Sequence, residues 1–231
     1  MLAIIPARGG SKGLPRKNIL LMNRKPLIYY TIKRALESRC LDEIVVSTDD
    51  KEIKSLSKKF GSKVVDRPEE FAKDKSPTID AIRHVIKTLK KEGKTFDIIL
   101  LLEPTSPLRK KDDIDKSIRS FVDNYTKADA LVSLGEIALE SPFISKIIKK
   151  GFVSPLIRSD KKVFQRQQLP KTYFPYGVVY MAKTKALLKT GTFYQRKTLP
   201  YIIERWQNYE VDDFYDFLSV ETIMKNRKGD F

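Results

Sequence analysis

Cysteine and histidine are almost missing from this chain. Its 231 residues include one cysteine, Cys40, and one histidine, His84. A lone cysteine excludes an intramolecular disulfide, and the two residues fall short of the roughly four ligands that a structural zinc site needs. His84 lies off the apolar stripe of the helix expected over residues 78–91. We therefore interpret it as a surface residue and not as a catalytic base.

Long apolar runs are missing as well. No run approaches the ~18 apolar residues of a membrane span, and we expect no basic and apolar leader ahead of Met1 and Leu2. We therefore expect a cytoplasmic protein without a membrane partner. The length and a hydrophobic fraction of 41% predict a single domain over residues 1–231, with a full core and a modest extension.

Acidic residues are too few to balance the basic ones: 29 stand against 45, which gives a formal net charge of +16. A nucleic-acid-binding protein is one explanation of this excess. However, the lysines come in scattered pairs, such as residues 58–59 and 90–91, mostly at expected helix ends and turns. We favour a lysine-rich surface that attracts anionic substrates, and we expect no specific nucleic-acid partner.

The common phosphate-binding loops are absent too, since the chain has neither the full Walker A pattern nor Gly-x-Gly-x-x-Gly. Residues 6–18 form a different loop, which follows the apolar, strand-like run 2–5. Its glycines and cations are Gly9, Gly10, Gly13, Arg8, Lys12, Arg16 and Lys17. Open α/β sheets bind ligands at the carboxyl ends of strands, and glycine amides with cations suit a polyphosphate. The alternative is a solvated basic loop.

Strand-like and helix-like segments alternate along the chain. Strands are expected at residues 2–5, 43–47, 63–65, 97–102 and 177–181, and helices at 26–38, 50–60, 78–91, 112–122 and 213–225. This alternation predicts an α/β fold with a doubly wound, mainly parallel sheet. Residues 135–165 break the rhythm with turns and short β-like pieces, and we interpret them as an inserted arm.

The loop at residues 6–18 resembles that of the acylneuraminate cytidylyltransferases, which make CMP-activated sialic acids and related nine-carbon keto-sugars. Further strings of that family recur in order at residues 47–50, 67–68, 104–109, 165–170 and 209–212. The resemblance implies a Rossmann-like nucleotidyltransferase fold. It also implies that CTP and a nonulosonic acid react to give a CMP-sugar and pyrophosphate. Relatives use a segment like residues 135–165 to form a homodimer, and the alternative is a hairpin on a monomer.

The resemblance assigns the nucleotide side of the site. It implies that Arg8 and Lys12 are catalytic phosphate ligands, joined by the amides of Gly9, Gly10 and Ser11. Lys17 and Asn18 also face the nucleotide, Arg67 lies on the CTP side, and Thr78 lies near the cytosine. For Arg67, the alternative is a surface salt bridge with Glu69 or Glu70.

Near the end of the chain, residues 209–212 match the family's Asp-Ile-Asp motif, with glutamate in place of the first aspartate. The match implies that Glu210 and Asp212 hold Mg²⁺ and that Asp212 is catalytic. Alternation along a strand places the two carboxylates on one face. The alternative for Asp212 is the N-cap of the last helix.

The sugar side departs further from the family. Glu103 replaces a usual glutamine and Tyr176 a usual asparagine, at positions that relatives use around the sugar. An ionised glutamate accepts hydrogen bonds but does not donate them. Arg166 and Gln167 keep the family pattern and are the expected contacts of the sugar carboxylate. Tyr180, Phe193 and Tyr194 are the expected aromatic contacts, with core packing as the alternative for the last two.

Two other enzymes of the same fold remain alternatives. One is a cytidylyltransferase for an eight-carbon keto-deoxy sugar, although its loop usually lacks paired glycines and a residue like Lys12. The other is a guanylyltransferase for legionaminic acid precursors.

Overall fold

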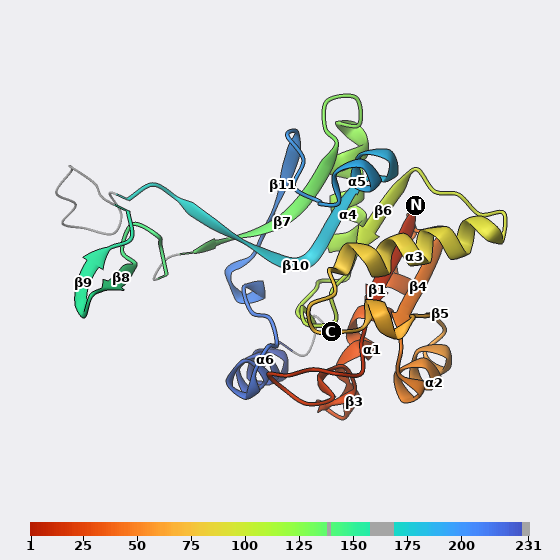
Figure 1. The fold of residues 1–231 in the computed structure, drawn as a ribbon, viewed down its shortest axis with the longest axis horizontal. Helices are drawn as coiled ribbons and strands as arrows, with labels where there is room; N and C mark the ends of the chain where they lie inside the picture. Colours follow the sequence, from red (N-terminus) through yellow and green to blue (C-terminus); the bar gives the residue numbers. More distant parts are fainter. Residues whose placement is uncertain (138–139, 158–168, 228–231) are drawn as a thin grey trace.

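A seven-stranded sheet lies at the centre of the molecule (Figure 1). The computed structural model describes residues 1–137, 140–157 and 169–227. In sheet order the strands are β11 (Thr198–Ile203), β7 (Ala130–Ile137), β10 (Thr172–Lys183), β6 (Ile98–Leu101), β1 (Leu2–Pro6), β4 (Glu43–Thr48) and β5 (Lys63–Asp66). β10 runs antiparallel to both of its neighbours, and the other adjacent strands are parallel. The expected mainly parallel sheet is confirmed.

Helices cover both faces of this sheet. They are α1 (Leu27–Leu36), α2 (Lys51–Lys59), α3 (Thr78–Lys91), α4 (Asp113–Asp123) and α5 (Thr184–Thr190), and a further helix, α6 (Phe214–Asn226), lies outside these two layers. Short 3-10 helices lie at η1 (Lys17–Ile19), η2 (Glu69–Phe71) and η4 (Arg205–Gln207). α2 begins where Asp50 Oδ1 accepts hydrogen bonds from the amides of Glu52 and Ile53, both at 2.9 Å.

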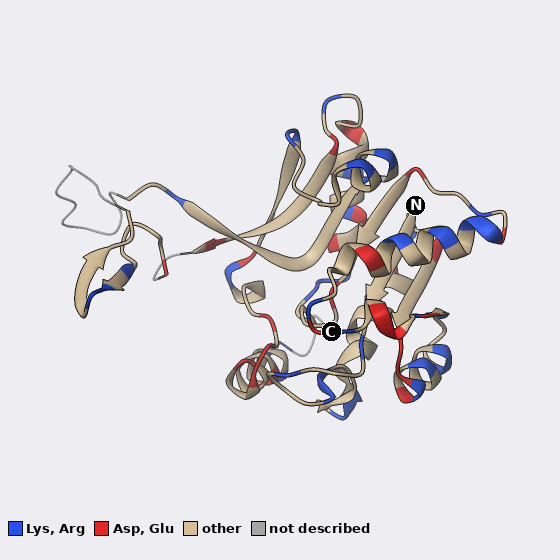
Figure 2. Ribbon diagram, in the orientation of Figure 1, with Lys and Arg blue, Asp and Glu red and all other residues tan. Residues whose placement is uncertain are grey.

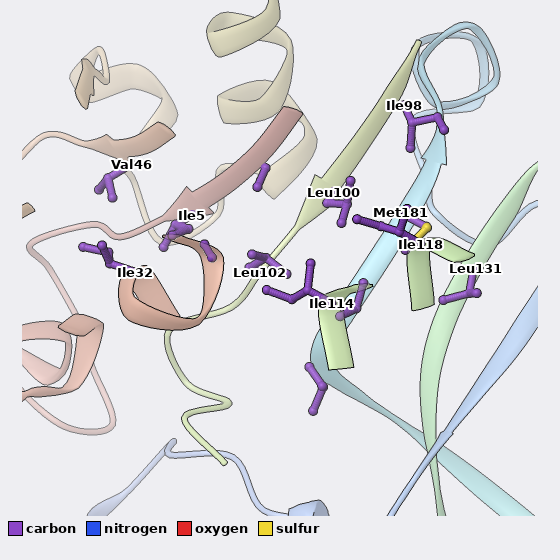
Figure 3. Close-up of a cluster of buried hydrophobic side chains, with 14 of the residues drawn as sticks. Ile5, Ile32, Val46, Ile98, Leu100, Leu102, Ile114, Ile118, Leu131 and Met181 are labelled. Carbon is purple, nitrogen blue, oxygen red and sulfur yellow. The ribbon is translucent and has the colours of Figure 1, made fainter. Parts of the chain in front are cut away.

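Alternation along the central strand explains the two cores. Ala3 and Ile5 of β1 pack with α1, α2 and α4 on one face, whereas Leu2 and Ile4 pack with α3 and α5 on the other. Figure 3 shows the first of these clusters, with labelled side chains from the strands and from α1 and α4. Since β1 is buried on both faces, its apolar run is continuous and not alternating. The doubly wound arrangement is therefore confirmed.

The carboxyl ends of the parallel strands meet at one edge. Pro6 at the end of β1 lies opposite Ser47 of β4, and the Leu102 amide after β6 donates to the carbonyl of Ile4. The segments that follow β1, β4, β5 and β6 consequently open onto this edge. The α6 helix packs beside α1 through a third core that contains Leu27, Tyr30 and Val220.

β7 and β10 continue beyond the body of the sheet as a long two-stranded ribbon (Figure 1). A small hairpin of β8 (Lys146–Lys149) and β9 (Phe152–Pro155) lies at its far end. Residues 135–137 belong to β7, although the sequence predicted that the insertion begins at residue 135. A Cβ on Gly135 would lie 1.9 Å from Asn208 Oδ1. This glycine therefore lets the Asn208 side chain approach the backbone of β7, and it does not form a turn.

A second small pairing joins β2 (Leu21–Met22) to β3 (Lys25–Pro26) ahead of α1. Over the described part of the chain, no helix combines the length and apolar character needed to span a membrane. Lysine and arginine are spread over several helices and the far hairpin, interspersed with acidic residues (Figure 2).

Candidate active site

A cleft of about 600 Å³ opens at the carboxyl edge of the sheet. It gathers most of the residues that the sequence predicted for the nucleotide and metal. These are Arg8, Ser11, Lys12, Lys17, Asn18, Arg67, Thr78, Glu210 and Asp212. Glu103, predicted for the sugar, also lines it. Gly9 and Gly10 belong to the same loop but are not among the lining residues.

The basic loop, residues 6–18, is held by one contact within the loop and one with the segment that follows β4. The Gly9 amide donates to Asp49 Oδ1 across 3.1 Å, and Asn18 Nδ2 donates to the Arg8 carbonyl across 3.0 Å. Arg16 points elsewhere, because its guanidinium pairs with Asp50 at 3.1 Å and Glu52 at 2.7 Å. Arg16 therefore fastens the loop to α2, while Arg8 and Lys12 face the cleft.

Asp74 bridges the two principal cations of the loop. One carboxylate oxygen lies 3.1 Å from Arg8 Nη1 and the other 2.8 Å from Lys12 Nζ. The hydrogen bond from Lys12 holds the pKa of Asp74 below its usual range. No sequence pattern pointed to this residue, which is flanked by Lys73 and Lys75. Its position shows that these two cations converge on a space that fits a small anion.

Arg67 is buried beneath the cleft. Its Nε donates to Ser47 Oγ across 3.1 Å and its Nη2 to the Ser47 carbonyl across 2.5 Å. Burial lowers the pKa of its guanidinium to about 10, partly opposed by Asp49. The ion pairs with Glu69 or Glu70 that formed the alternative do not occur among the described residues.

The acidic segment, residues 209–212, contacts the basic loop, and both line the cleft. Asp212 is well exposed, with 77% of its side chain accessible, and its Oδ1 accepts a hydrogen bond from Lys17 Nζ at 2.8 Å. Asp213, and not Asp212, is the N-cap of α6, because Asp213 Oδ1 accepts from the Asp216 amide at 2.9 Å. The N-cap interpretation of Asp212 is therefore wrong, and its carboxylate is available to the cleft.

Glu210 lies deeper than Asp212. Its Oε1 accepts hydrogen bonds from Ser106 Oγ at 2.6 Å and from the Gly177 amide. Burial raises the pKa of the Glu210 carboxyl, and these two hydrogen bonds act in the opposite direction. Glu210 is thus tied to the 104–109 motif and to the middle of β10.

Glu103 follows β6 and sits against Gly177. A Cβ on Gly177 would lie 2.2 Å from Glu103 Oε2, so only glycine leaves room for this carboxyl. Burial, and after it the charge of Glu210, raises the pKa of Glu103 to about 7. Asp212 acts in the same direction, and the cations of Arg109 and Lys17 oppose it.

Arg109 is a supporting residue whose role in the site the sequence did not reveal. Its side chain is fully buried, and it donates to the carbonyls of Val178 at 2.6 Å and Gly177 at 2.9 Å. It also donates to Thr31 Oγ1 at 3.1 Å and to the Glu103 carbonyl at 3.3 Å. The planar guanidinium fork therefore fixes the irregular part of β10 against the end of β6, where Glu103 begins.

A smaller hollow of about 260 Å³ adjoins the cleft, and Thr78 and Glu103 line both. Tyr180, Phe193 and Tyr194, the predicted aromatic contacts of the sugar, form its aromatic wall. The ring centroid of Tyr180 lies 6.0 Å from that of Phe193 and 6.4 Å from that of Tyr194. Phe193 is buried and Tyr194 is 53% exposed, so the first also serves the core.

Other predicted sugar contacts are not found in these hollows. Tyr176 packs against the core and against Phe174, with ring centroids 5.2 Å apart, and it lines neither hollow. Arg166 and Gln167 lie outside the described residues. Their assignment to the sugar carboxylate stays a prediction.

The donors in the cleft fit a magnesium ion better than a softer metal. In the described ranges, no three histidine, cysteine, aspartate or glutamate side chains converge closely enough to enclose a metal. Magnesium keeps several waters and needs only one or two carboxylates beside phosphate oxygens. The exposed Asp212 carboxylate fits this requirement directly, and the more buried Glu210 fits through its second oxygen or a water.

Comparison with known proteins decides the family. A cytidylyltransferase family model matches residues 2–231. The chain belongs to the cytidylyltransferase family. The family expected from the loop and the ordered strings is confirmed, and with it the expectation of a nucleotidyltransferase enzyme.

Curated relatives share about a third of their residues with this cytidylyltransferase. It is 33% identical to the CMP-N,N'-diacetyllegionaminic acid synthase of Legionella pneumophila, over 97% of this chain and 96% of that protein. It is 31% identical to the N-acylneuraminate cytidylyltransferase of Escherichia coli, over 99% of this chain but 53% of that protein. The chain thus spans about half the length of some curated relatives and nearly all of others.

A solved CMP:2-keto-3-deoxy-manno-octonic acid synthetase complexed with CTP has a similar fold. The TM-score is 0.71 and the alignment covers 97% of this chain and 98% of that one, at 19% sequence identity. At this identity the likeness concerns the fold alone.

Proposed function

We propose that this cytidylyltransferase joins CTP to a nine-carbon 2-keto acid sugar, giving a CMP-sugar and pyrophosphate. The observation that carries the proposal is the cleft, where Arg8 and Lys12 converge from one side and Asp212 faces them from the other. A nucleotide α-phosphate needs such a combination of cations and carboxylate-bound metal. The names of the Legionella and Escherichia relatives support the sugar class.

In this proposal the sugar hydroxyl on C2 attacks the α-phosphorus in line with the leaving pyrophosphate. One oxygen–phosphorus bond forms, the bond from the α-phosphorus to the bridging oxygen breaks with its electron pair leaving on pyrophosphate, and the hydroxyl proton passes to solvent water. Arg8, Lys12 and the loop amides stabilise the charge that builds on the nonbridging oxygens. Arg67 and Thr78 bind the rest of the nucleotide from the floor of the same cleft.

We assign the metal to Asp212 and Glu210, and Mg²⁺ is the ion that their oxygen donors fit. When bound, magnesium would neutralise triphosphate charge and favour departure of pyrophosphate. Lys17, paired with Asp212 at 2.8 Å, orients that carboxylate toward the cleft.

The sugar would occupy the hollow beside the cleft, between Glu103 and the aromatic wall. We also propose that the arm at residues 135–165 forms a homodimer and that the partner's arm completes the sugar side. Ile148, Phe152 and Val153 support this proposal, because they are 78%, 77% and 72% exposed on the hairpin. We treat residues 1–231 as one catalytic domain. CTP is available in the cytoplasm, where we expect the reaction.

Phosphorus NMR of a reaction with CTP, magnesium and an N-acylated nine-carbon 2-keto acid tests the proposal. We expect one phosphodiester resonance from the CMP-sugar and one resonance from pyrophosphate, in equal amounts. Hydrolysis of CTP without the phosphodiester would contradict transfer to the sugar.

A further inference from the structure

The hollow beside the cleft combines apolar walls with a single charge. Its aromatic side is Tyr180, Phe193 and Tyr194, and aliphatic carbons of Ile79 and Ile82 complete much of the rest. Among the described residues that line it, Glu103 is the one charged side chain. Thr78, Thr192 and the two tyrosines add hydroxyl groups, so the carboxylate is the feature that distinguishes this hollow from a site for a neutral substituent.

The Glu103 carboxyl has no donor within the described protein. No hydrogen bond or ion pair reaches its side-chain oxygens, although its carbonyl is bonded by Arg109 and Thr31. The neighbouring cations are committed elsewhere: Arg109 binds carbonyls and Thr31, and Lys17 binds Asp212. The half-buried carboxyl lines both the cleft and the hollow, so a ligand in either space can supply the donor that the protein does not.

The lining of the hollow favours a positively charged group. Among the described residues that line it there is no lysine or arginine to neutralise the Glu103 carboxylate. The faces of aromatic rings also attract cations, and three such rings line the hollow.

We propose that Glu103 selects a nine-carbon 2-keto acid that carries a basic nitrogen, an amine or an amidine, whose cationic group enters the aromatic hollow beside the carboxylate. This inference rests on the proposed function and names the substrate class within it. An amidinium matches a carboxylate with two parallel N–H donors, and an ammonium ion matches it as a point charge. The glutamine usual in relatives would suit a neutral N-acyl group instead.

Three matched substrates test this assignment: one nonulosonic acid as its N-acetyl form, as the free amine, and as the acetamidine at the same nitrogen. Steady-state rates with CTP and magnesium give kcat/KM for each. For the wild-type enzyme, we expect kcat/KM for the better of the two basic substrates to exceed that for the N-acetyl form at least tenfold. The Glu103→Gln variant, which keeps the volume, should lose at least tenfold on the basic substrates and favour the N-acetyl form.

The Glu43→Gln variant is the control, because Glu43 pairs with Lys94 at the amino end of β4, far from the cleft edge. It should leave the preference unchanged. A wild-type preference for the N-acetyl substrate that Glu103→Gln does not alter would overturn the inference while leaving the proposed function intact. The same holds if Glu103→Gln alters only the magnesium dependence. Failure of all three sugars to release pyrophosphate from CTP would overturn both.

Discussion

The Lys17 ammonium donates a hydrogen bond to Asp212 Oδ1 across 2.8 Å, joining residues 195 positions apart in the chain. A second contact joins the same two segments, since a Cβ on Gly13 would lie 2.5 Å from the Asp212 carbonyl. The basic loop and the acidic segment are therefore fitted to each other. We infer that they act as the two sides of one site.

Replacing Asp212 by asparagine separates metal binding from folding. Asparagine keeps the volume and removes the charge, so we expect kcat to fall by orders of magnitude with an unchanged melting temperature. Asp213→Asn is the control, because Asp213 caps α6 and asparagine caps helices about as well as aspartate. Rates measured against magnesium concentration provide the comparison. A normal rate and magnesium dependence in Asp212→Asn would end the metal assignment.

Removing either loop cation tests the phosphate assignment. Arg8→Ala and Lys12→Ala should each lose about 2–4 kcal/mol of transition-state stabilisation, as expected for one preorganised donor. Arg16→Ala is the matched control, since Arg16 pairs with Asp50 and Glu52 and does not line the cleft. Equal kcat/KM values in all three variants would show that the loop is only a basic surface.

Asp74 competes with an incoming triphosphate for the same cations. The Asp74→Asn variant should therefore bind CTP more tightly, by roughly threefold to tenfold, because a carboxylate that competes with the phosphates for Arg8 and Lys12 is removed. Calorimetric titration with CTP measures the change. The gain should disappear in a Lys12→Ala background. Weaker CTP binding by Asp74→Asn would instead mean that the carboxylate holds Arg8 and Lys12 in place for the nucleotide.

Glu103 links stability to pH. Its pKa is raised from 4.5 to about 7, so the folded chain binds this proton more tightly than the unfolded chain does. Stability should therefore fall as the pH rises from about 4.5 through 7, by roughly 2–3 kcal/mol. Glu103→Gln should remove this loss and be more stable than wild type at pH 8. Urea unfolding at several pH values, with a chelator present, measures the free energy of unfolding of both proteins. If this free energy changed with pH in the same way for wild type and Glu103→Gln, Glu103 would not be responsible.

The exposed apolar residues of the β8–β9 hairpin predict dimerisation. Phe152→Ser combined with Val153→Ser should yield monomers in light scattering at micromolar concentration, with reduced activity. Leu21→Ser is a matched control, because Leu21 is 61% exposed and lies away from the arm. A wild-type chain that is monomeric and fully active would remove both the dimer and the shared site.

The sequence predicted the strands and helices that carry strong local patterns. β1, α3 and the cap of α2 were accessible because each depends on neighbouring residues alone. β11 was missed because Pro200 interrupts its pattern, which an edge strand tolerates. β10 was expected only from residue 177, since Pro175 and the register shift that follows obscure its first half.

The sequence located residues of the candidate cleft where a motif itself supplies them, and their roles stay predictions. Arg8, Lys12 and Asp212 meet at one cleft because parallel strands bring their loops to one edge. Asp74 had no signal, since its role depends on where residues 69–76 fold over the loop. Arg109 belonged to a recognised string, but its buried contacts with β10 exist only in three dimensions.

The most direct measurement of the central claim is pyrophosphate release with each of the four nucleoside triphosphates, combined in turn with sialic, legionaminic, pseudaminic and octulosonic acids. The account predicts turnover with CTP and at least one nine-carbon acid, and little with the other nucleotides or the eight-carbon acid. Robust turnover with GTP and none with CTP would contradict it.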